Sequence, residues 1–297
     1  MLESWIFWSL LAACMQSVRT AGQKYLTADV SPLAATLVRY LFAVPFVILY
    51  IAWLLADREV TLPPLSLHFV VACFIAGVLQ ILATVLLVRL FTLRNFAVGS
   101  CYIRSEVLTT AILGLLLFGE FVSGLGWVAM LTCVAGLVLI TIAKTDKLSE
   151  LWNQSALYGL GAGVSLSFTS LMIRQASLSF GIDDAMFTAA LTLGFMVLMQ
   201  TVICLMLVLY SNASELRVVF RRWRPSLFVG ITSVVGSAGW FTAFTLERAA
   251  YVKTLGQIEF LITLAISIFF FKEAPSRLEW LGMLMLVGGV VLLLLAP

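Results

Sequence analysis

Two glutamates stand deep inside apolar segments of this chain. Glu106 and Glu259 each lie about ten residues into a stretch long enough to cross a bilayer. Each is followed four residues later by a threonine, Thr110 or Thr263, on the same helical face. A charge at this depth costs at least ~2.5–3.5 kcal/mol on insertion scales, so it should face the bundle interior or water. The pair predicts either reversible proton sites, favoured by desolvation of the carboxylates, or structural ion pairs or hydrogen bonds that brace the two helices.

The other polar side chains expected inside the membrane are mostly cations and amides. The candidates are Gln16, Arg19, Gln23, Arg39, Gln80, Tyr102, Arg104, Lys253 and Gln257. Guanidinium groups hold carboxylates or phosphates through two hydrogen bonds, so a cavity with these groups would favour anionic or zwitterionic solutes. Two other roles remain open: Arg104 neutralising Glu259, and Arg19 and Lys253 reaching the lipid headgroups.

One aromatic residue joins these candidates. Trp240 is expected near mid-membrane, away from the interfacial belt that tryptophans usually occupy. It could contact an apolar part of a substrate or simply pack in the core.

The composition places the chain in a membrane. Of its 297 residues 62% are hydrophobic and only 11% are charged, and the mean hydropathy is +1.08. A soluble domain carries about 25% charged residues. We therefore predict an all-α integral membrane protein. Its ten expected transmembrane helices cover residues 4–26, 32–55, 67–90, 97–118, 122–143, 155–179, 185–210, 225–246, 250–271 and 277–296.

Turn-forming residues support these limits. Asp29, Ser31 and Asp183 are candidate caps for the helices that follow them, and Arg224-Pro225 is expected to separate two helices.

Other classes of protein find little support. The five cysteines are scattered through apolar segments without zinc-ligand or CxxC spacing, and His68 is the only histidine. We expect buried cysteines without disulfides, and no metal site. Phosphate-binding loops, nucleophile elbows, HExxH and dinucleotide motifs are missing. We therefore expect no enzyme activity, no cofactor and no nucleic-acid partner.

The second half of the sequence repeats the first. Residues 97–143 align with residues 250–296 without a gap, at a constant offset of 153 positions. Matched pairs include Glu106 with Glu259, Phe118 with Phe271, Glu120 with Glu273, Trp127 with Trp280, and Gly136 with Gly289. Five helices per repeat is an odd number, so the second copy must enter the membrane from the opposite side. We predict two inverted five-helix repeats, residues 1–147 and 148–297, around a central cavity.

The distribution of basic residues predicts an orientation. Of the 18 lysines and arginines, most of those in loops fall on one side, dominated by the cluster from Arg217 to Arg224. The positive-inside rule makes this side cytoplasmic, which places both termini outside.

The repeated motif identifies a family. Phe118-Gly119-Glu120, Trp127 and Gly136-Leu137 in the first half, with their counterparts in the second, resemble the motif of EamA-type transporters of the drug/metabolite transporter superfamily. The resemblance implies ten helices and export of amino acids, other small metabolites or drugs, driven by protons or exchange. It also implies cytoplasmic termini, which conflicts with the charge count. Glu120 and Glu273 belong to the motif but lie at helix junctions, where a carboxylate favours the N-terminus of the next helix, so we expect both to be structural.

We therefore expect a secondary transporter that exports a small organic metabolite, such as an amino acid or another anionic or zwitterionic solute, across a bacterial inner membrane. Alternating access, with protons as a potential second substrate, would operate in a monomer or homodimer. The alternatives are an organic-cation or drug exporter using the Glu106 and Glu259 carboxylates, an exchanger of phosphorylated metabolites, and a membrane scaffold or sensor.

Overall fold

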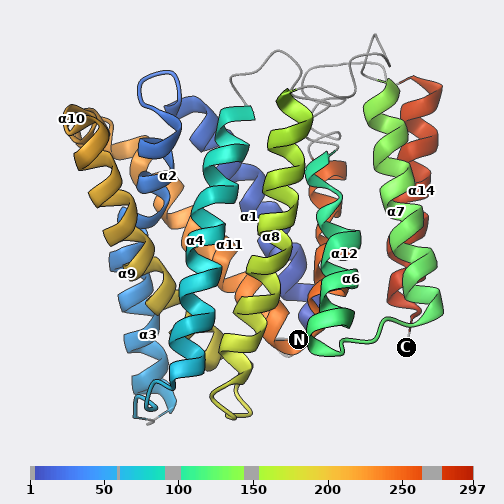
Figure 1. Cartoon of the computed structure of the whole chain (residues 1–297), viewed down its shortest axis with the longest axis horizontal. Coiled ribbons are helices and arrows are strands. Elements are labelled where there is room, and N and C mark those ends of the chain that lie inside the picture. Colours follow the sequence, from blue (N-terminus) through green and yellow to red (C-terminus); the bar gives the residue numbers. More distant parts are fainter. Residues whose placement is uncertain (1–3, 59–60, 91–101, 144–153, 263–275, 297) are drawn as a thin grey trace.

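The computed structural model describes residues 4–58, 61–90, 102–143, 154–262 and 276–296. Within these ranges every regular element is a helix (Figure 1). The helices are α1 (Trp5–Leu26), α2 (Pro32–Leu41), α3 (Val44–Arg58), α4 (Leu67–Leu90), α6 (Glu106–Phe118), α7 (Gly124–Ala143), α8 (Gln154–Leu178), α9 (Ala185–Asn212), α10 (Ser214–Arg221), α11 (Trp223–Leu246), α12 (Ala249–Gly256) and α14 (Arg277–Leu294).

Seven helical segments of the described chain are long and apolar enough to cross a membrane, with α2 and α3 counted together. The 22-residue α1, which carries Gln16, Arg19 and Gln23, is not among them, and α6 is apolar but shorter. The outward faces of the bundle are rich in large apolar side chains, such as Leu116, which is 73% exposed. Such a surface is suited to lipid contact rather than to water. The structure is therefore that of an all-helical, multi-pass membrane protein.

Several predicted helix limits were wrong. The segment 32–55 is interrupted at Phe42 and Ala43, because Pro45 has no N–H to continue the helical hydrogen bonds. The break predicted at Arg224-Pro225 lies two residues earlier, at Arg222, and α11 begins at Trp223, since proline is tolerated in a first turn.

The helix caps agree with the prediction in part. Ser31 caps α2, accepting a hydrogen bond from the Ala34 N–H. The cap of α9 is Asp184, whose carboxylate accepts from the Phe187 N–H, and not Asp183. The repeat boundary at 147/148, Thr263, Glu273, and the outer ends of the predicted helices 97–118 and 250–271 lie outside the described residues.

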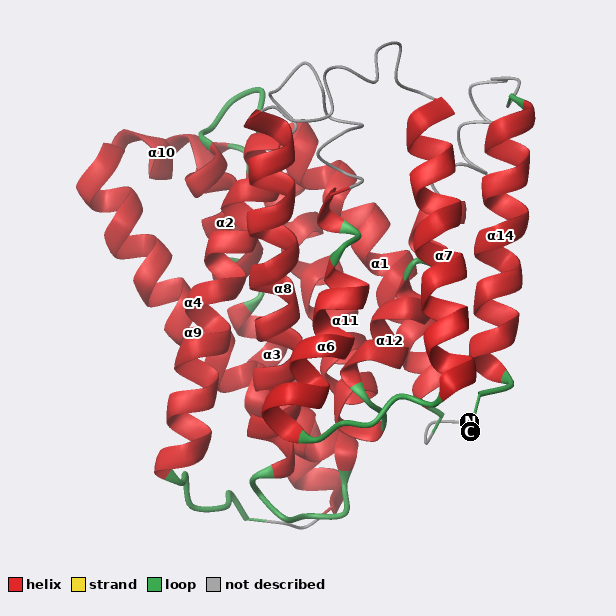
Figure 2. Ribbon diagram, turned by 45° about the vertical axis from the view of Figure 1, so that its right-hand side comes forward, coloured by secondary structure: helices red, strands yellow, loops and turns green. Residues whose placement is uncertain are grey.

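Helices α7 and α14 stand side by side at one edge of the bundle (Figures 1 and 2). Their contacts are reciprocal. Gly289 faces Ala129, and Gly136 faces Gly282. The offset of 153 converts one pair into the other, because Gly289 corresponds to Gly136 and Gly282 corresponds to Ala129. Between them, the Cys133 thiol lies 3.7 Å from the Leu286 carbonyl oxygen, and these two positions differ by the repeat offset of 153. The two helices therefore run antiparallel about a local two-fold relation.

Four of the remaining long helices pack as two pairs, and the offset of 153 places α1 near the position of α8 and α4 near that of α11. Helix α4 packs against α8, and α1 against α11. The α1–α11 contact is close because Gly239 and Gly236 of α11 face Trp8, Ala12 and Met15 of α1, where a side chain would collide. Small residues thus bring the two repeats together along their length.

Charged side chains close both ends of the bundle. We call the lower face the end at which α6 stops and α7 starts in Figure 1. There Arg58, at the end of α3, forms an ion pair with Asp184. At the upper face Arg222 pairs with Asp29 over 3.1 Å. The apolar layer between these charged ends defines the membrane-spanning part of the described chain.

Candidate functional site

A polar cavity lies between the two repeats. It is lined by Gln16, Arg19, Arg39, Thr84, Arg104, Glu106, Trp240, Lys253, Gln257 and Glu259, with Ala83, Leu87, Leu166 and Gly256. A second hollow shares Arg19, Arg39 and Lys253 with it and extends to Gln80. Each encloses about 40 Å³, room for a few waters but not for an organic solute. This conformation is therefore closed around the site.

The two deep glutamates stand where their helices deviate from α-helical geometry. Before α6, the Val107 N–H bonds to the Arg104 carbonyl, three residues back rather than four. After α12, the Phe260 N–H bonds to the Gln257 carbonyl in the same way. These two hydrogen bonds occupy the same place in the two repeats, because both the donor and the acceptor residues differ by 153 positions. The predicted continuous helices at 97–118 and 250–271 are thus interrupted just before Glu106 and Glu259, as in transporters whose binding sites use discontinuous helices.

Glu106 forms an ion pair with Lys253. The Lys253 Nζ donates to Glu106 Oε2 over 3.1 Å, and both side chains are buried. Glu106 occupies the first turn of α6 and Lys253 the last turn of α12. An anion at a helix N-terminus and a cation at a C-terminus are both stabilised by the helix dipole. Helix geometry and direct pairing therefore stabilise the same two charges.

Among the described residues, the partners of Glu259 include an amide and an arginine. The Gln16 amide donates to Glu259 Oε2 over 2.8 Å, while Arg104 lies farther away, with Nη1 3.9 Å from that oxygen. Gln16 in turn accepts a hydrogen bond of 2.9 Å from the Trp240 Nε1–H. Since the Gln16 amide can donate and accept at once, it links Trp240 of α11 to the carboxylate.

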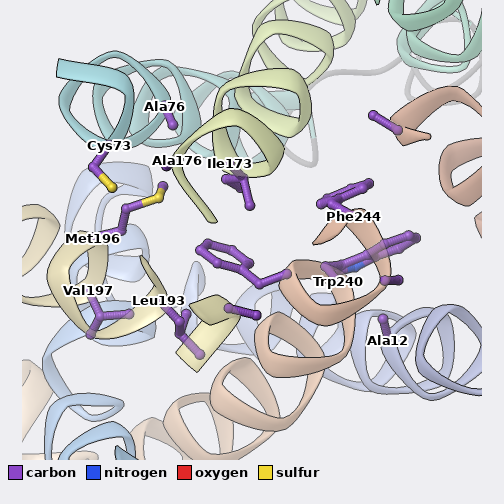
Figure 3. Close-up of a cluster of buried hydrophobic side chains, with 14 of the residues drawn as sticks. Ala12, Cys73, Ala76, Ile173, Ala176, Leu193, Met196, Val197, Trp240 and Phe244 are labelled. Atoms are coloured by element: carbon purple, nitrogen blue, oxygen red, sulfur yellow. The ribbon is translucent and has the colours of Figure 1, made fainter. Parts of the chain in front are cut away.

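Trp240 and Phe244 form an aromatic pair beside Lys253. Their ring centroids are 5.6 Å apart in a stacked arrangement, next to Ala12 of α1 (Figure 3). The Lys253 Nζ lies 5.5 Å from the Trp240 ring centroid and 5.7 Å from that of Phe244, within cation–π range. Gly256 is required here, because a Cβ at this position would collide with the Trp240 ring.

Arg19 and Arg39 line the same cavity without a carboxylate partner among the described residues. Arg39 donates to Thr84 Oγ1 over 2.9 Å and lies over the Tyr40 ring. Arg19 is only 4% exposed, and its Nε and Nη1 atoms have no hydrogen-bond acceptor. It lies in the cavity and does not extend to the headgroups.

The remaining candidates have varied positions. Gln80 accepts a 2.8 Å hydrogen bond from the amide of Gln200, a residue in α9 that the sequence analysis missed although its amide stands within an apolar helix. Gln257 lines the cavity and donates to the Lys253 carbonyl. Gln23 donates to the Ala35 carbonyl, and neither it nor Tyr102 lines the cavity. Thr84 is a further cavity residue whose mid-helix hydroxyl could have indicated it.

Glu120, one residue of the repeated motif, is bound by an arginine of α8. Arg174 of α8 forms a 3.0 Å ion pair with Glu120, and its guanidinium also donates to the carbonyls of Phe244, Thr245 and Glu247. The arginine thus caps the end of α11 and ties it to the end of α6. Gly119 ends α6 in a left-handed conformation, with φ of 65°, which glycine adopts without strain.

A larger vestibule of about 680 Å³ lies at the lower face. Its lining includes Arg58, Asp183, Asp184, Thr242 and Thr245. Phe241 and Phe244, which neighbour these threonines on α11, line the central cavity instead. The vestibule and the second hollow therefore border different sides of α11.

In the described part of the chain, no cysteine lines either of the two central hollows. Cys73, Cys133 and Cys204 are buried, as expected, but Cys14 is exposed, which corrects the expectation for that position. Cys101 lies outside the described residues.

The helical bundle has a charged cavity between its two sequence repeats, and interrupted helices line this cavity. This is the architecture of a secondary transporter. The sequence model of the EamA-like transporter family matches residues 3–142 and again residues 153–295. The chain therefore belongs to the EamA-like transporter family, which is part of the drug/metabolite transporter superfamily. This confirms the resemblance seen in the repeated motif.

One solved crystal structure of a protein is similar along almost the whole chain. It covers 98% of this chain and 96% of its own, with a TM-score of 0.74 and 14% sequence identity. At this identity the likeness shows a shared fold. No curated protein matches the sequence significantly.

Proposed function

We propose that this protein exports a small anionic or zwitterionic metabolite by alternating access through the central cavity. The observation that carries the proposal is the pair of crossed interactions at the interrupted helices. Glu106 of the first repeat binds Lys253 of the second, and Glu259 of the second repeat contacts Gln16 and Arg104 of the first. A solute with a carboxylate or phosphate would compete with these glutamates for the cations.

The proposed topology is ten transmembrane helices in two inverted repeats, residues 1–147 and 148–297. The antiparallel contacts of α7 with α14 support this arrangement, since two-fold related helices must run in opposite directions through the membrane. The mechanism follows from it. Rocking of one repeat against the other breaks contacts that cross the repeat interface, and the crossed interactions are of this kind.

Outward transport of an anion is favoured by the membrane potential. Across an inside-negative bacterial inner membrane, an exported anion gains about 2.3 kcal/mol per charge for each 100 mV. Protons offer a second coupling route, because protonation of Glu106 would release Lys253 for the solute. Replacement of Glu106 by Gln should then abolish the dependence of flux on a pH gradient, and undiminished dependence would exclude this role.

An organic cation is a poorer fit to the cavity. Both carboxylates already have positively charged or amide partners, and two arginines add further positive charge. A cation would have to displace Lys253 and then face Arg19 and Arg39.

The test uses purified protein and proteoliposomes. Thermal stability is measured with a panel of amino acids, carboxylates, phosphorylated metabolites and organic cations, and flux is measured for each stabilising compound. A ligand at 100 times its Kd should add about 2.7 kcal/mol of stability. We expect stabilisation and flux with acids, both lost in Lys253→Gln. Stabilisation by cations alone, lost in Glu106→Gln, would contradict the proposal.

A further inference from the structure

The charges in the central cavity do not balance. Four cationic side chains line it, Arg19, Arg39, Arg104 and Lys253, against two anionic ones, Glu106 and Glu259. The described part of the cavity therefore carries an excess of two positive charges. Buried charge is strongly unfavourable unless it is paired, so an excess of this kind calls for a counter-ion.

The excess is concentrated on two neighbouring arginines. Lys253 binds Glu106, and Arg104 lies within 4 Å of Glu259, which leaves Arg19 and Arg39 without an ion pair among the described residues, although Glu259 is near enough to attract Arg19 electrostatically. Their exposed fractions are only 4% and 7%. They lie close enough for Arg39 to repel Arg19 electrostatically, and both border each of the two central hollows.

The donors of these arginines are free to bind an anion. Arg19 offers Nε and Nη1, which have no acceptor, while Arg39 uses Nη1 for Thr84 and retains its other N–H groups. Guanidinium donors form a planar fork that fits the oxygens of a phosphate or carboxylate. Arg19 is thus a buried, unpartnered cation that borders a cavity.

We propose that Arg19 and Arg39 bind the doubly charged phosphate group of a small phosphate monoester, which is the transported solute. This inference rests on the proposed transport function and specifies its substrate class. A phosphate monoester places about −1.5 to −2 charge on one group at pH 7, which matches the excess of two positive charges at one location. A dicarboxylate divides the same charge between two separated groups, and a zwitterion or monocarboxylate leaves an arginine unneutralised.

The surroundings of Arg39 suit the remainder of such a molecule. Beyond it, a small hollow of about 10 Å³ has both apolar and polar side chains in its lining, and the polar ones include Gln80, Gln200, Ser233 and Ser237. The Ser233 hydroxyl is buried and has no partner. These amides and hydroxyls can bind the hydroxyl groups of a short polyol phosphate.

Calorimetric binding and thermal unfolding of the purified protein test this assignment. The probes are glycerol 3-phosphate, succinate and alanine at equal ionic strength. We expect glycerol 3-phosphate to bind at least about tenfold more tightly than succinate or alanine. Arg19→Gln and Arg39→Gln should each weaken its binding by about 10- to 100-fold, the effect of losing a charge-assisted interaction. Arg221→Gln, an exposed control on α10, should bind as the wild type does.

The unfolding temperature without ligand separates binding from structural roles. If Arg19 serves the ligand, Arg19→Gln removes a buried charge that forms no ion pair among the described residues, and the apo protein should melt at the same or a higher temperature. If the arginine is structural, the variant should melt lower. Lower melting of Arg19→Gln, together with unchanged ligand affinity in Arg39→Gln, would overturn the proposal.

The outcomes also distinguish this inference from the proposed function. Suppose that alanine or succinate binds with the same affinity as glycerol 3-phosphate, and that this binding is lost in Lys253→Gln but survives in Arg19→Gln. The transport site would then stand, but the assignment of a phosphate group would be rejected. Absence of binding by all three probes would reject the phosphate assignment. If proteoliposomes also show no flux with the wider panel, the transport proposal fails as well.

Discussion

Glu106 and Glu259 occupy equivalent positions of the two repeats but have different surroundings. Glu106 makes a direct 3.1 Å ion pair with Lys253, at the meeting of a helix start and a helix end. Glu259 accepts a hydrogen bond from Gln16 and lies 3.9 Å from Arg104. The repeat therefore supplies the same acid twice, once in a tight charge pair and once in a looser polar network.

The difference arises from residues that the repeat does not duplicate. By the offset of 153, Lys253 corresponds to Ser100, and Arg104 corresponds to Gln257. Each half contributes one cation to the glutamate of the other half. The glutamates share their backbone setting because the repeat shares it, whereas their electrostatic partners are particular to each half.

The largest effect is expected for Lys253→Met. It leaves Glu106 buried without its cation, which should lower the free energy of unfolding by about 3–5 kcal/mol. Chemical unfolding in detergent measures this loss. The double variant Glu106→Gln with Lys253→Met should recover most of it, and Arg221→Gln should have no effect. A loss below about 1 kcal/mol would show that the pair is no tighter than the Glu259 network.

A second change tests the packing difference between the repeats. Gly256 lies against Trp240, whereas its counterpart in the first repeat is Ile103. Gly256→Ala should destabilise the protein by about 2 kcal/mol, because the added methyl group forces the indole ring to move. Thermal unfolding and tryptophan fluorescence report the change. Gly288→Ala is the matched control, since its added methyl group meets open space.

Neutralising each glutamate compares the two sites directly. Glu106→Gln removes the counter-charge of Lys253, which lies 3.1 Å away, while Glu259→Gln removes that of Arg104, which lies 3.9 Å away. We expect the first to cost about 1 kcal/mol more stability than the second. Parallel unfolding curves of the two variants give this difference. Equal losses would indicate that Arg104 holds Glu259 as firmly as Lys253 holds Glu106.

The smallest effect is expected for Trp240→Phe. This change removes the hydrogen bond to Gln16 but retains a ring beside Phe244 and Lys253. A neutral hydrogen bond contributes about 0.5–1.5 kcal/mol, so the unfolding free energy should fall by about that amount. The same variant in a Glu106→Gln background should lose as much. Strong coupling there would show that the two glutamates do not act independently.

Part of the site could be predicted from the sequence, because a charged residue within an apolar segment indicates by itself that its side chain faces the protein interior. An ionisable residue within twenty apolar residues must face the interior, so Glu106, Glu259, Arg39 and Arg104 were identified from their settings alone. The caps show the limit of such reasoning. Of the adjacent Asp183 and Asp184, only the second has the backbone geometry to reach the Phe187 N–H.

Interactions across the repeats could not be predicted in the same way. Glu106 and Lys253 are 147 positions apart, and Gln16 and Glu259 are 243 apart. No local pattern specifies such pairs. Gln23 lies in the same polar stripe as Arg19 but donates to the Ala35 carbonyl, because packing of α1 against α2 places it outside the cavity.

The sequence by itself determined that this protein crosses a membrane, that its halves are repeats, and which family it belongs to. Hydropathy and a gapless internal alignment are properties of the chain that need no coordinates. Only the tertiary structure decided which cation meets which glutamate, where the helices are interrupted, and that Arg19 and Arg39 share a cavity in which neither forms an ion pair with a described carboxylate. These depend on how helices pack side by side, and packing is fixed by contacts between residues far apart in sequence.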